Sequence, residues 1–233
     1  MDDDRSLASR RRRRLVLANL LILGVLGGLS ILFLSQHWGN APIDAPQRDV
    51  ASAAPPTTLP PTTTTTTLPP PGPGFVPGHV TAVGDSVMLD YQDPLQTAIP
   101  GINVDAAVSR QWSDGVQILQ QLKASGQLGA EVIVGLGTNG PITDGDFDAM
   151  MQVLRGASRV VFVNFHVDRP WQDPNNTVLA NGATRYPNVF IADWATLATQ
   201  NPEWFGADGT HLAIDGPGAT ALATLVASTL TSG

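Results

Sequence analysis

The chain has 233 residues, of which 42% are hydrophobic, and this length suffices for one ordinary domain with additional segments. It contains no cysteine, which excludes a disulfide framework, a thiol nucleophile and a zinc site built on thiolates. The formal net charge is −7, but residues 1–14 hold six arginines against three aspartates, which leaves 7 basic and 17 acidic residues and a net charge of −10 in the remainder. An acidic globular part argues against a nucleic-acid partner, because phosphate binding needs a basic face.

The first segment with a clear pattern is residues 15–34, which carry no formal charge and directly follow five consecutive arginines. Twenty apolar residues in a helix match the hydrocarbon thickness of a bilayer, and the basic flank stays in the cytoplasm. We therefore predict a cytoplasmic tail at 1–14, a single-pass anchor at 15–34 and an extracytoplasmic remainder. The alternative is a cleaved signal peptide, but its apolar region is usually shorter, and Gln36-His37-Trp38 is a poor context for cleavage.

Residues 35–74 are rich in proline and threonine, with a run of six threonines at 62–67. Such a composition cannot bury enough apolar surface to fold, and its prolines keep it extended. We predict a disordered linker that holds a domain of residues 75–233 away from the membrane, within the cell wall.

From residue 79 onward, short apolar segments alternate with amphipathic ones. The pattern predicts strands at 80–83, 102–107, 131–136, 159–164 and 189–193. It predicts helices at 87–99, with Pro94 bending this helix or limiting its start, and at 113–125, 143–154, 177–185 and 216–230. This alternation indicates the α/β class, with three α/β/α layers around a flavodoxin-like, five-stranded parallel sheet.

The first strand runs into Gly84-Asp85-Ser86, which places Ser86 where a strand turns into a helix. Alone this turn is ambiguous, since Asp and Ser are also common helix caps. Far downstream, His211 can take a proton from Ser86, and Asp208 can hold the imidazole in the required tautomer. The set therefore predicts a serine nucleophile, and the only rival base, His166, has no acid at a comparable spacing.

A serine nucleophile also needs donors for the oxyanion that forms on its target. We expect these to be the Ser86 backbone N–H, a backbone N–H near Ser109 and the side-chain amide of Asn139, because all three follow strands at one edge of the sheet.

In chain order, Gly84-Asp85-Ser86, the polar turn after the second strand, Gly137-Thr138-Asn139 and Asp208-x-x-His211 resemble the conserved blocks of the SGNH (GDSL-like) hydrolase superfamily. The resemblance covers the globular part and implies the SGNH hydrolase fold and a triad of Ser86, His211 and Asp208. It also implies an oxyanion hole from Ser86, Ser109 and Asn139, and no cofactor.

More narrowly, residues 104–111 and 137–140 are similar to the extracytoplasmic domain of peptidoglycan O-acetyltransferases and related acyltransferase-3 proteins. Two departures matter. The superfamily has glycine where we place Ser109, and these acyltransferases carry a many-span domain that supplies acyl groups, whereas this chain has one predicted span. The second departure favours an esterase, or a transferase fed by a separate membrane acyl-donor protein.

Four further residues are candidate substrate contacts, although each of them is also compatible with packing: Arg110, Gln111, Trp112 and Trp171. The four histidines are scattered and the Asp144-Asp146-Asp148 series lacks the later glutamate of a calcium loop, so we predict no metal site.

We therefore expect a membrane-anchored, extracytoplasmic serine esterase or O-acyltransferase. Its substrate would be O-acyl groups, most simply acetyl, on cell-envelope glycan or a small ester. The alternative is a non-catalytic, envelope-binding module that retains the SGNH fold.

Overall fold

A computed structural model describes residues 70–214 and 216–232 of the chain. The predicted cytoplasmic tail (1–14), the anchor (15–34) and all but the last five residues of the linker (35–74) lie outside the described residues. Within the described ranges, no helix combines the length and apolar character that crossing a bilayer requires.

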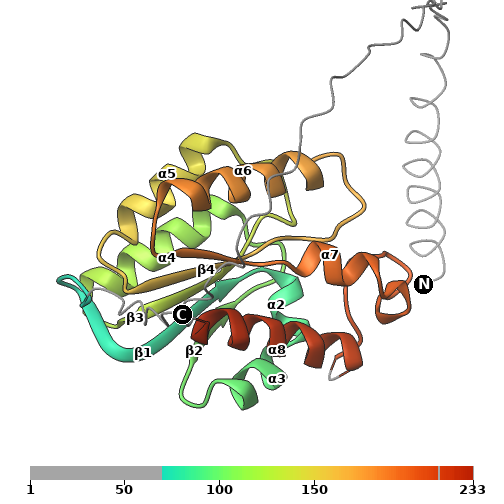
Figure 1. The fold of residues 1–233 in the computed structure, drawn as a ribbon, viewed down its shortest axis with the longest axis horizontal. Coiled ribbons are helices and arrows are strands. Elements are labelled where there is room, and N and C mark those ends of the chain that lie inside the picture. The colour runs from blue at the N-terminus through green and yellow to red at the C-terminus, as the bar shows by residue number, and fades with distance from the viewer. Residues whose placement is uncertain (1–69, 215, 233) are drawn as a thin grey trace, which may run out of the picture. The chain divides into compact units, whose positions relative to one another are not determined.

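Five parallel strands form one sheet with the order β2-β1-β3-β4-β5 (Figure 1). The strands are β1 (Phe75–Gly84), β2 (Asn103–Ala106), β3 (Leu128–Gly135), β4 (Arg159–Val163) and β5 (Val189–Ala192). The chain steps outward from β1 to β2 and then crosses back to β3, so the strand order reverses between β1 and β3. In open sheets of this kind, ligands bind beyond the carboxyl ends of the strands at such a reversal. The predicted flavodoxin-like sheet is confirmed.

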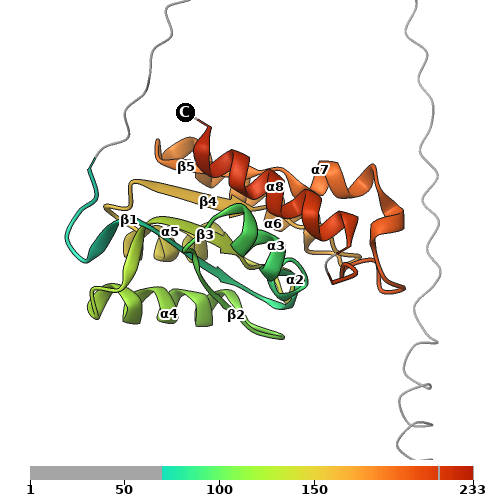
Figure 2. The same cartoon turned by 90° about the horizontal axis from the view of Figure 1, so that it is seen from below.

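Helices cover both faces of the sheet. They are α2 (Ser86–Asp90), α3 (Gln92–Ala98), α4 (Trp112–Ala124), α5 (Asp144–Val153), α6 (Gln172–Arg185), α7 (Trp194–Thr199) and α8 (Pro217–Thr231), with a short 3-10 helix η1 (Pro202–Trp204). Residues of α4, α5 and α6 build the core on one face, and residues of α2, α3, α7 and α8 build it on the other. Figure 2 shows α4 and α8 on opposite sides of the sheet.

The central strands are apolar on both faces because both are covered. In β3, Val132 and Val134 belong to the core shared with Phe147, whereas Ile133 between them belongs to the core shared with Leu222. The continuous apolar runs at 131–136 and 159–164 were recognisable for this reason.

Several details differ from the sequence prediction. Three elements begin earlier than predicted: β1 at residue 75, β3 at 128 and α6 at 172, instead of 80, 131 and 177. The predicted helix at 87–99 is two helices, because Tyr91 leaves the helical conformation (φ −120°, ψ 16°). Pro94 lies in the first turn of α3, where a helix needs no N–H donor, and this agrees with the predicted alternative that it limits the start of a helix. Helix α7 and η1 were not predicted, since segments of six and three residues show no clear periodicity. Ordered contacts also begin before residue 75, where the Gly72 N–H donates to the Gly156 carbonyl at 2.7 Å.

Candidate active site

Ser86 is the first residue of α2, directly after the carboxyl end of β1. Asp85 caps this helix with its side chain, which accepts a hydrogen bond from the Val87 N–H at 3.1 Å. The Asp85 N–H donates to the Gly135 carbonyl at the end of β3. The turn is thus fixed between the two central strands, and the Ser86 N–H points from a helix start where backbone donors have no helical partner.

The structure brings Ser86 together with His211, which is 125 residues away in the chain: His211 Nε2 lies 2.9 Å from Ser86 Oγ. On the other side of the ring, Nδ1 lies 2.7 Å from Asp208 Oδ2. The remaining Asp208 oxygen accepts the backbone N–H groups of Thr210 and His211, each at 3.0 Å. The hydrogen bond with the imidazole, followed by those from the backbone, holds the pKa of Asp208 well below its ordinary value. Asp208 is therefore a carboxylate at any pH near neutral.

Asp85 itself is fully buried, and its second oxygen accepts the Thr138 N–H at 3.4 Å. Burial raises the pKa of Asp85, and the hydrogen bonds from Val87 and Thr138 partly offset this. One buried carboxyl group therefore joins the nucleophile turn to the loop after β3. The sequence alone predicts only that Asp85 belongs to the turn, because its link to the later loop is a tertiary contact.

The loop at 137–142 carries Asn139, whose side-chain Nδ2 donates to the Arg110 carbonyl at 3.3 Å. The buried side chain of Asn175 in α6 fixes this loop through three hydrogen bonds. Its Oδ1 accepts the Ile142 N–H at 2.9 Å, and its Nδ2 donates to the Gly137 and Gly140 carbonyls. The second proton of the Asn139 amide has no hydrogen-bond partner among the described residues, so it can donate to an oxyanion. The sequence pattern alone does not predict this supporting role of Asn175.

The backbone conformation and the close packing at position 137 of this loop require a glycine. Its φ of 125° is rarely adopted by residues with a side chain, and a Cβ there would lie 2.6 Å from the Phe165 ring.

Ser109 follows β2 and has a φ of 58°, the one positive φ of a non-glycine residue in the described ranges. The left-handed conformation costs roughly 1–2 kcal/mol for a residue with a Cβ. The position where the SGNH blocks have glycine is thus occupied here by a residue under backbone strain.

The candidate substrate contacts have mostly structural partners. Arg110 pairs with Asp105 at 2.6 Å and donates to the Gly84 carbonyl, and Gln111 forms a capping box at the start of α4. Trp171 donates its indole N–H to the Thr138 carbonyl at 3.2 Å.

Trp112 is only 7% exposed, stacks on Phe162 and donates its indole N–H to the Asp146 carbonyl. These contacts are those of a packed core residue, which is one of the two alternatives for Trp112, and its side chain also lines the second of the hollows described next.

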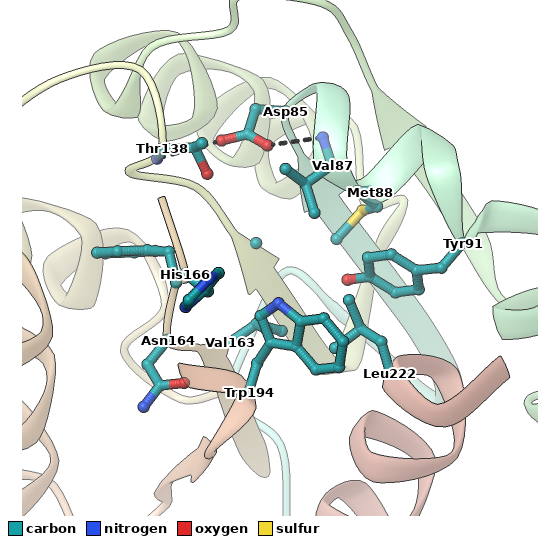
Figure 3. Close-up of a pocket in the computed structure, with 12 residues that line it drawn as sticks. Asp85, Val87, Met88, Tyr91, Thr138, Val163, Asn164, His166, Trp194 and Leu222 are labelled. Atoms are coloured by element: carbon teal, nitrogen blue, oxygen red, sulfur yellow. Dashed lines mark hydrogen bonds between the residues drawn. The ribbon is translucent and has the colours of Figure 1, made fainter. Parts of the chain in front are cut away.

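Two hollows lie next to the Ser86 turn and the loop at 137–142. The first is mainly apolar and is bounded by Asp85, Val87, Met88, Tyr91, Gly135, Thr138, Val163, Asn164, Phe165, His166, Trp194 and Leu222 (Figure 3). The Tyr91 hydroxyl points into it, and His166 lies on the opposite side. The second is polar and is bounded by Arg110, Gln111, Trp112, Ser113, Gly137, Asn139, Gly140, Pro141, Ile142 and Asp146.

His166, the rival base, faces the first hollow and packs against Phe205, with ring centroids 4.9 Å apart. Its Nδ1 is buried without a hydrogen-bond partner among the described residues, and burial lowers its pKa. Ser86 Oγ is hydrogen-bonded to the imidazole of His211 and not to that of His166. Over the same ranges, no group of three or more carboxylates or histidines is arranged to hold a metal ion.

Comparison with known proteins finds peptidoglycan O-acetyltransferases among the relatives of the chain, although no protein-family model matches it. The peptidoglycan O-acetyltransferase OatA of Listeria monocytogenes is 37% identical over 131 residues, which are 56% of this chain and 21% of that protein. The chain spans about a fifth of the length of the first curated relatives it matches.

Solved structures agree with these relatives. The C-terminal catalytic domain of Streptococcus pneumoniae peptidoglycan O-acetyltransferase A, carrying a methylsulfonyl adduct, matches with a TM-score of 0.57 and 26% identity, over 65% of this chain and 89% of that one. An acetyl esterase with a bound acetate ion matches with a TM-score of 0.53 and 15% identity, over 65% and 95%, which shows the fold alone. These findings confirm the resemblance to peptidoglycan O-acetyltransferases and to the SGNH hydrolase fold that was predicted from the sequence.

Proposed function

We propose that this chain, an SGNH-fold relative of peptidoglycan O-acetyltransferases, is a serine esterase or O-acyltransferase that acts on O-acetyl groups of cell-envelope glycan. The observation that carries the proposal is the hydrogen-bonded line from Asp208 through His211 to Ser86, with contacts of 2.7 and 2.9 Å. Such a line turns a weakly acidic hydroxyl into a nucleophile, because the imidazole takes its proton as the new bond forms.

In the first half-reaction, Ser86 Oγ attacks the ester carbonyl and His211 Nε2 accepts the hydroxyl proton. The carbonyl oxygen becomes an oxyanion, which we place against the Ser86 N–H, the Asn139 Nδ2 and the N–H near Ser109. When the intermediate collapses, the bond to the leaving alcohol breaks and His211 returns the proton to that alcohol. An acyl-serine results.

In the second half-reaction, water or a sugar hydroxyl loses its proton to His211 and attacks the acyl-serine. The bond to Ser86 Oγ then breaks, and Ser86 recovers its proton from the imidazolium. Asp208 remains a carboxylate throughout, fixes the Nδ1–H tautomer and stabilises the positive charge on the ring.

We assign the apolar hollow of Figure 3 to the acyl group. It adjoins the nucleophile through Asp85 and Val87, and its floor includes Met88 and Trp194, which are almost completely buried. Gly135 also lines this hollow, and a Cβ added at this position would lie 3.0 Å from the Met88 methyl group. Such a limited space suits a short acyl chain such as acetyl.

We assign the polar hollow to the sugar that loses or gains the acyl group. It is bounded by Asn139, by Gln111 and Ser113 at the start of α4 and by Asp146 in the first turn of α5, and these side chains hydrogen-bond well to hydroxyl groups. Of the predicted substrate contacts, Arg110, Gln111 and Trp112 line this hollow. Trp171 supports its loop through the Thr138 carbonyl.

The setting is also part of the proposal. Residues 15–34 would anchor the chain with its N-terminus in the cytoplasm, and residues 35–74 would place the domain of residues 75–233 at the envelope glycan. Transfer from a cytoplasmic acyl donor would then need a separate membrane protein that delivers the acyl group outside.

The test is hydrolysis of p-nitrophenyl acetate by the full chain in mild detergent, with Ser86→Ala and, as a matched control, Ser125→Ala. Ser125 is exposed at the end of α4, and its hydroxyl contacts only its own helix. We expect Ser86→Ala to lose activity and labelling by a fluorophosphonate probe, and Ser125→Ala to keep both. Equal rates for Ser86→Ala and the native chain, together with glycan binding and no labelling, would favour the non-catalytic module.

A further inference from the structure

The last residue of α2, Asp90, connects the two halves of the proposed active site. It follows Ser86 by four residues, so both side chains lie on one face of the helix. Its Oδ2 accepts the backbone N–H of Leu212 at 3.0 Å, and Leu212 directly follows His211. One carboxylate thus ties the helix that carries the nucleophile to the loop that carries the base.

The loop that presents His211 is braced internally at its two ends. Phe205 and Leu212 form an antiparallel bridge, and the Gly206 N–H donates to the His211 carbonyl at 2.8 Å. These contacts set the shape of the loop, but they do not set its position over α2. In the described part of the chain, two hydrogen bonds link the loop to α2: the one between His211 and Ser86, and the one from Leu212 to Asp90.

The surroundings of Asp90 disfavour the charged form of its side chain. It is half-buried near the charge of Asp208, and both effects raise its pKa, whereas the Leu212 N–H and the charge of His211 act in the opposite direction. The charge of His211 also acts on Asp85, so the ring interacts electrostatically with three aspartates. A neutral side chain of similar size would avoid the repulsion but, if apolar, would leave the Leu212 N–H without its acceptor.

We propose that Asp90 is a positioning residue, whose carboxylate fixes the Leu212 backbone and thereby holds the His211 imidazole within hydrogen-bond reach of Ser86. Its effect on rate rests on the function proposed above. Displacement of a catalytic group by about 1 Å can reduce turnover by about 10²-fold, so a single anchoring bond next to the base matters.

The kinetic test compares Asp90→Ala, Asp90→Asn and Asp93→Ala in the full chain, with p-nitrophenyl acetate as substrate. The asparagine keeps an oxygen that accepts the Leu212 N–H and removes the charge, and Asp93 is an exposed aspartate in the next helix. We expect Asp90→Ala to lower kcat by roughly 10- to 100-fold with little change in KM. Asp90→Asn should stay within about threefold of the native chain, and Asp93→Ala should match it. Native kcat in Asp90→Ala, or equal losses in Asp90→Ala and Asp90→Asn, would overturn the proposal.

Hydrogen exchange of the backbone amides at 205–212 gives a readout that does not depend on activity. We expect faster exchange at this loop in Asp90→Ala, and native exchange in Asp90→Asn and Ser86→Ala, with all variants unfolding cooperatively. Unchanged exchange in Asp90→Ala would refute the positioning role. Faster exchange in Asp90→Ala, combined with full esterase activity in Ser86→Ala, would instead refute the proposed function and leave the positioning role intact.

Discussion

Replacement of Asp208 by asparagine isolates the chemical part of its role from the structural part. The native side chain accepts three hydrogen bonds: its Oδ1 accepts two backbone N–H groups, and its Oδ2 lies 2.7 Å from His211 Nδ1. In Asp208→Asn the amide oxygen can retain both backbone bonds, so the loop keeps its shape. The amide nitrogen then faces Nδ1, and it can only donate.

This exchange forces the wrong tautomer on His211. With Nδ1 acting as acceptor, the ring proton moves to Nε2, which then donates toward Ser86 Oγ and cannot take its proton. The same substitution in a serine protease lowers turnover by about 10⁴-fold. Here the Asp208 and His211 side chains are 53% and 43% exposed, so water can compensate in part. We therefore expect a loss near 10³-fold, which is about 4 kcal/mol of transition-state stabilisation at 1.36 kcal/mol per decade.

The assay is kcat for p-nitrophenyl acetate at pH 7–8, with thermal unfolding recorded on the same samples. Asp144→Asn is the matched control, because Asp144 is exposed and pairs with Arg185 at 3.4 Å, in α5 and α6. Retention of more than a tenth of native kcat by Asp208→Asn would refute the assignment of the orienting role to Asp208.

Three further substitutions test the surroundings of the site. Gly135→Ala should push the Met88 methyl group, which lies 3.0 Å from the added Cβ, into the acyl hollow. The rate of p-nitrophenyl butyrate hydrolysis should then fall more than the rate of p-nitrophenyl acetate hydrolysis. Equal reductions of the two rates would contradict the assignment of this hollow to the acyl group. Ser109→Gly should raise the free energy of unfolding by about 0.5–1 kcal/mol, because glycine adopts a φ of 58° without the steric strain of a side chain. A loss of stability in urea unfolding would contradict this prediction. Burial raises the pKa of Asp85 in the native state above its ordinary value of 3.8. The native state therefore binds this proton more tightly than the unfolded state does. The resulting stabilisation is fully present below pH 3.8 and is lost as the pH rises through the native pKa. The stability of the native chain relative to Asp85→Asn should therefore decline as the pH rises from about 3.5, whereas a difference independent of pH would show that the shift is absent.

The parts of the fold that were predictable are those with a local signal. Strands β3 and β4 are buried on both faces, so their apolar runs are visible in the sequence without any alignment. The break at Tyr91 has no such signal, since this residue leaves the helix while it packs into the core with Leu95. Its conformation is set by tertiary contacts, which local propensity does not contain.

The same distinction applies to the site. A serine nucleophile needs a base and a carboxylate, which few residue types can supply, and this limits the candidates to residues such as His211 and Asp208. Their order along the chain then predicts the triad of Ser86, His211 and Asp208. Asn175 offers no comparable signal, because a polar residue in a weakly amphipathic segment is typical of an exposed helix face. It is completely buried because α6 passes beneath the loop at 137–142, and only the fold reveals this.

Whether water or a sugar completes the second half-reaction depends on access to the acyl-serine. Since both Asp208 and His211 are about half exposed, the described part of the chain leaves the base accessible to water. Hydrolysis should therefore proceed without an acceptor, with one acetate released for each p-nitrophenol. A glycan seated in the polar hollow beside Asn139 would exclude that water and offer its own hydroxyl. We expect millimolar glycan acceptor to lower the ratio of acetate to p-nitrophenol below one, with acetylated sugar as the balance. A ratio that stays at one would identify an esterase, because the acceptor would then neither displace water nor capture the acyl group.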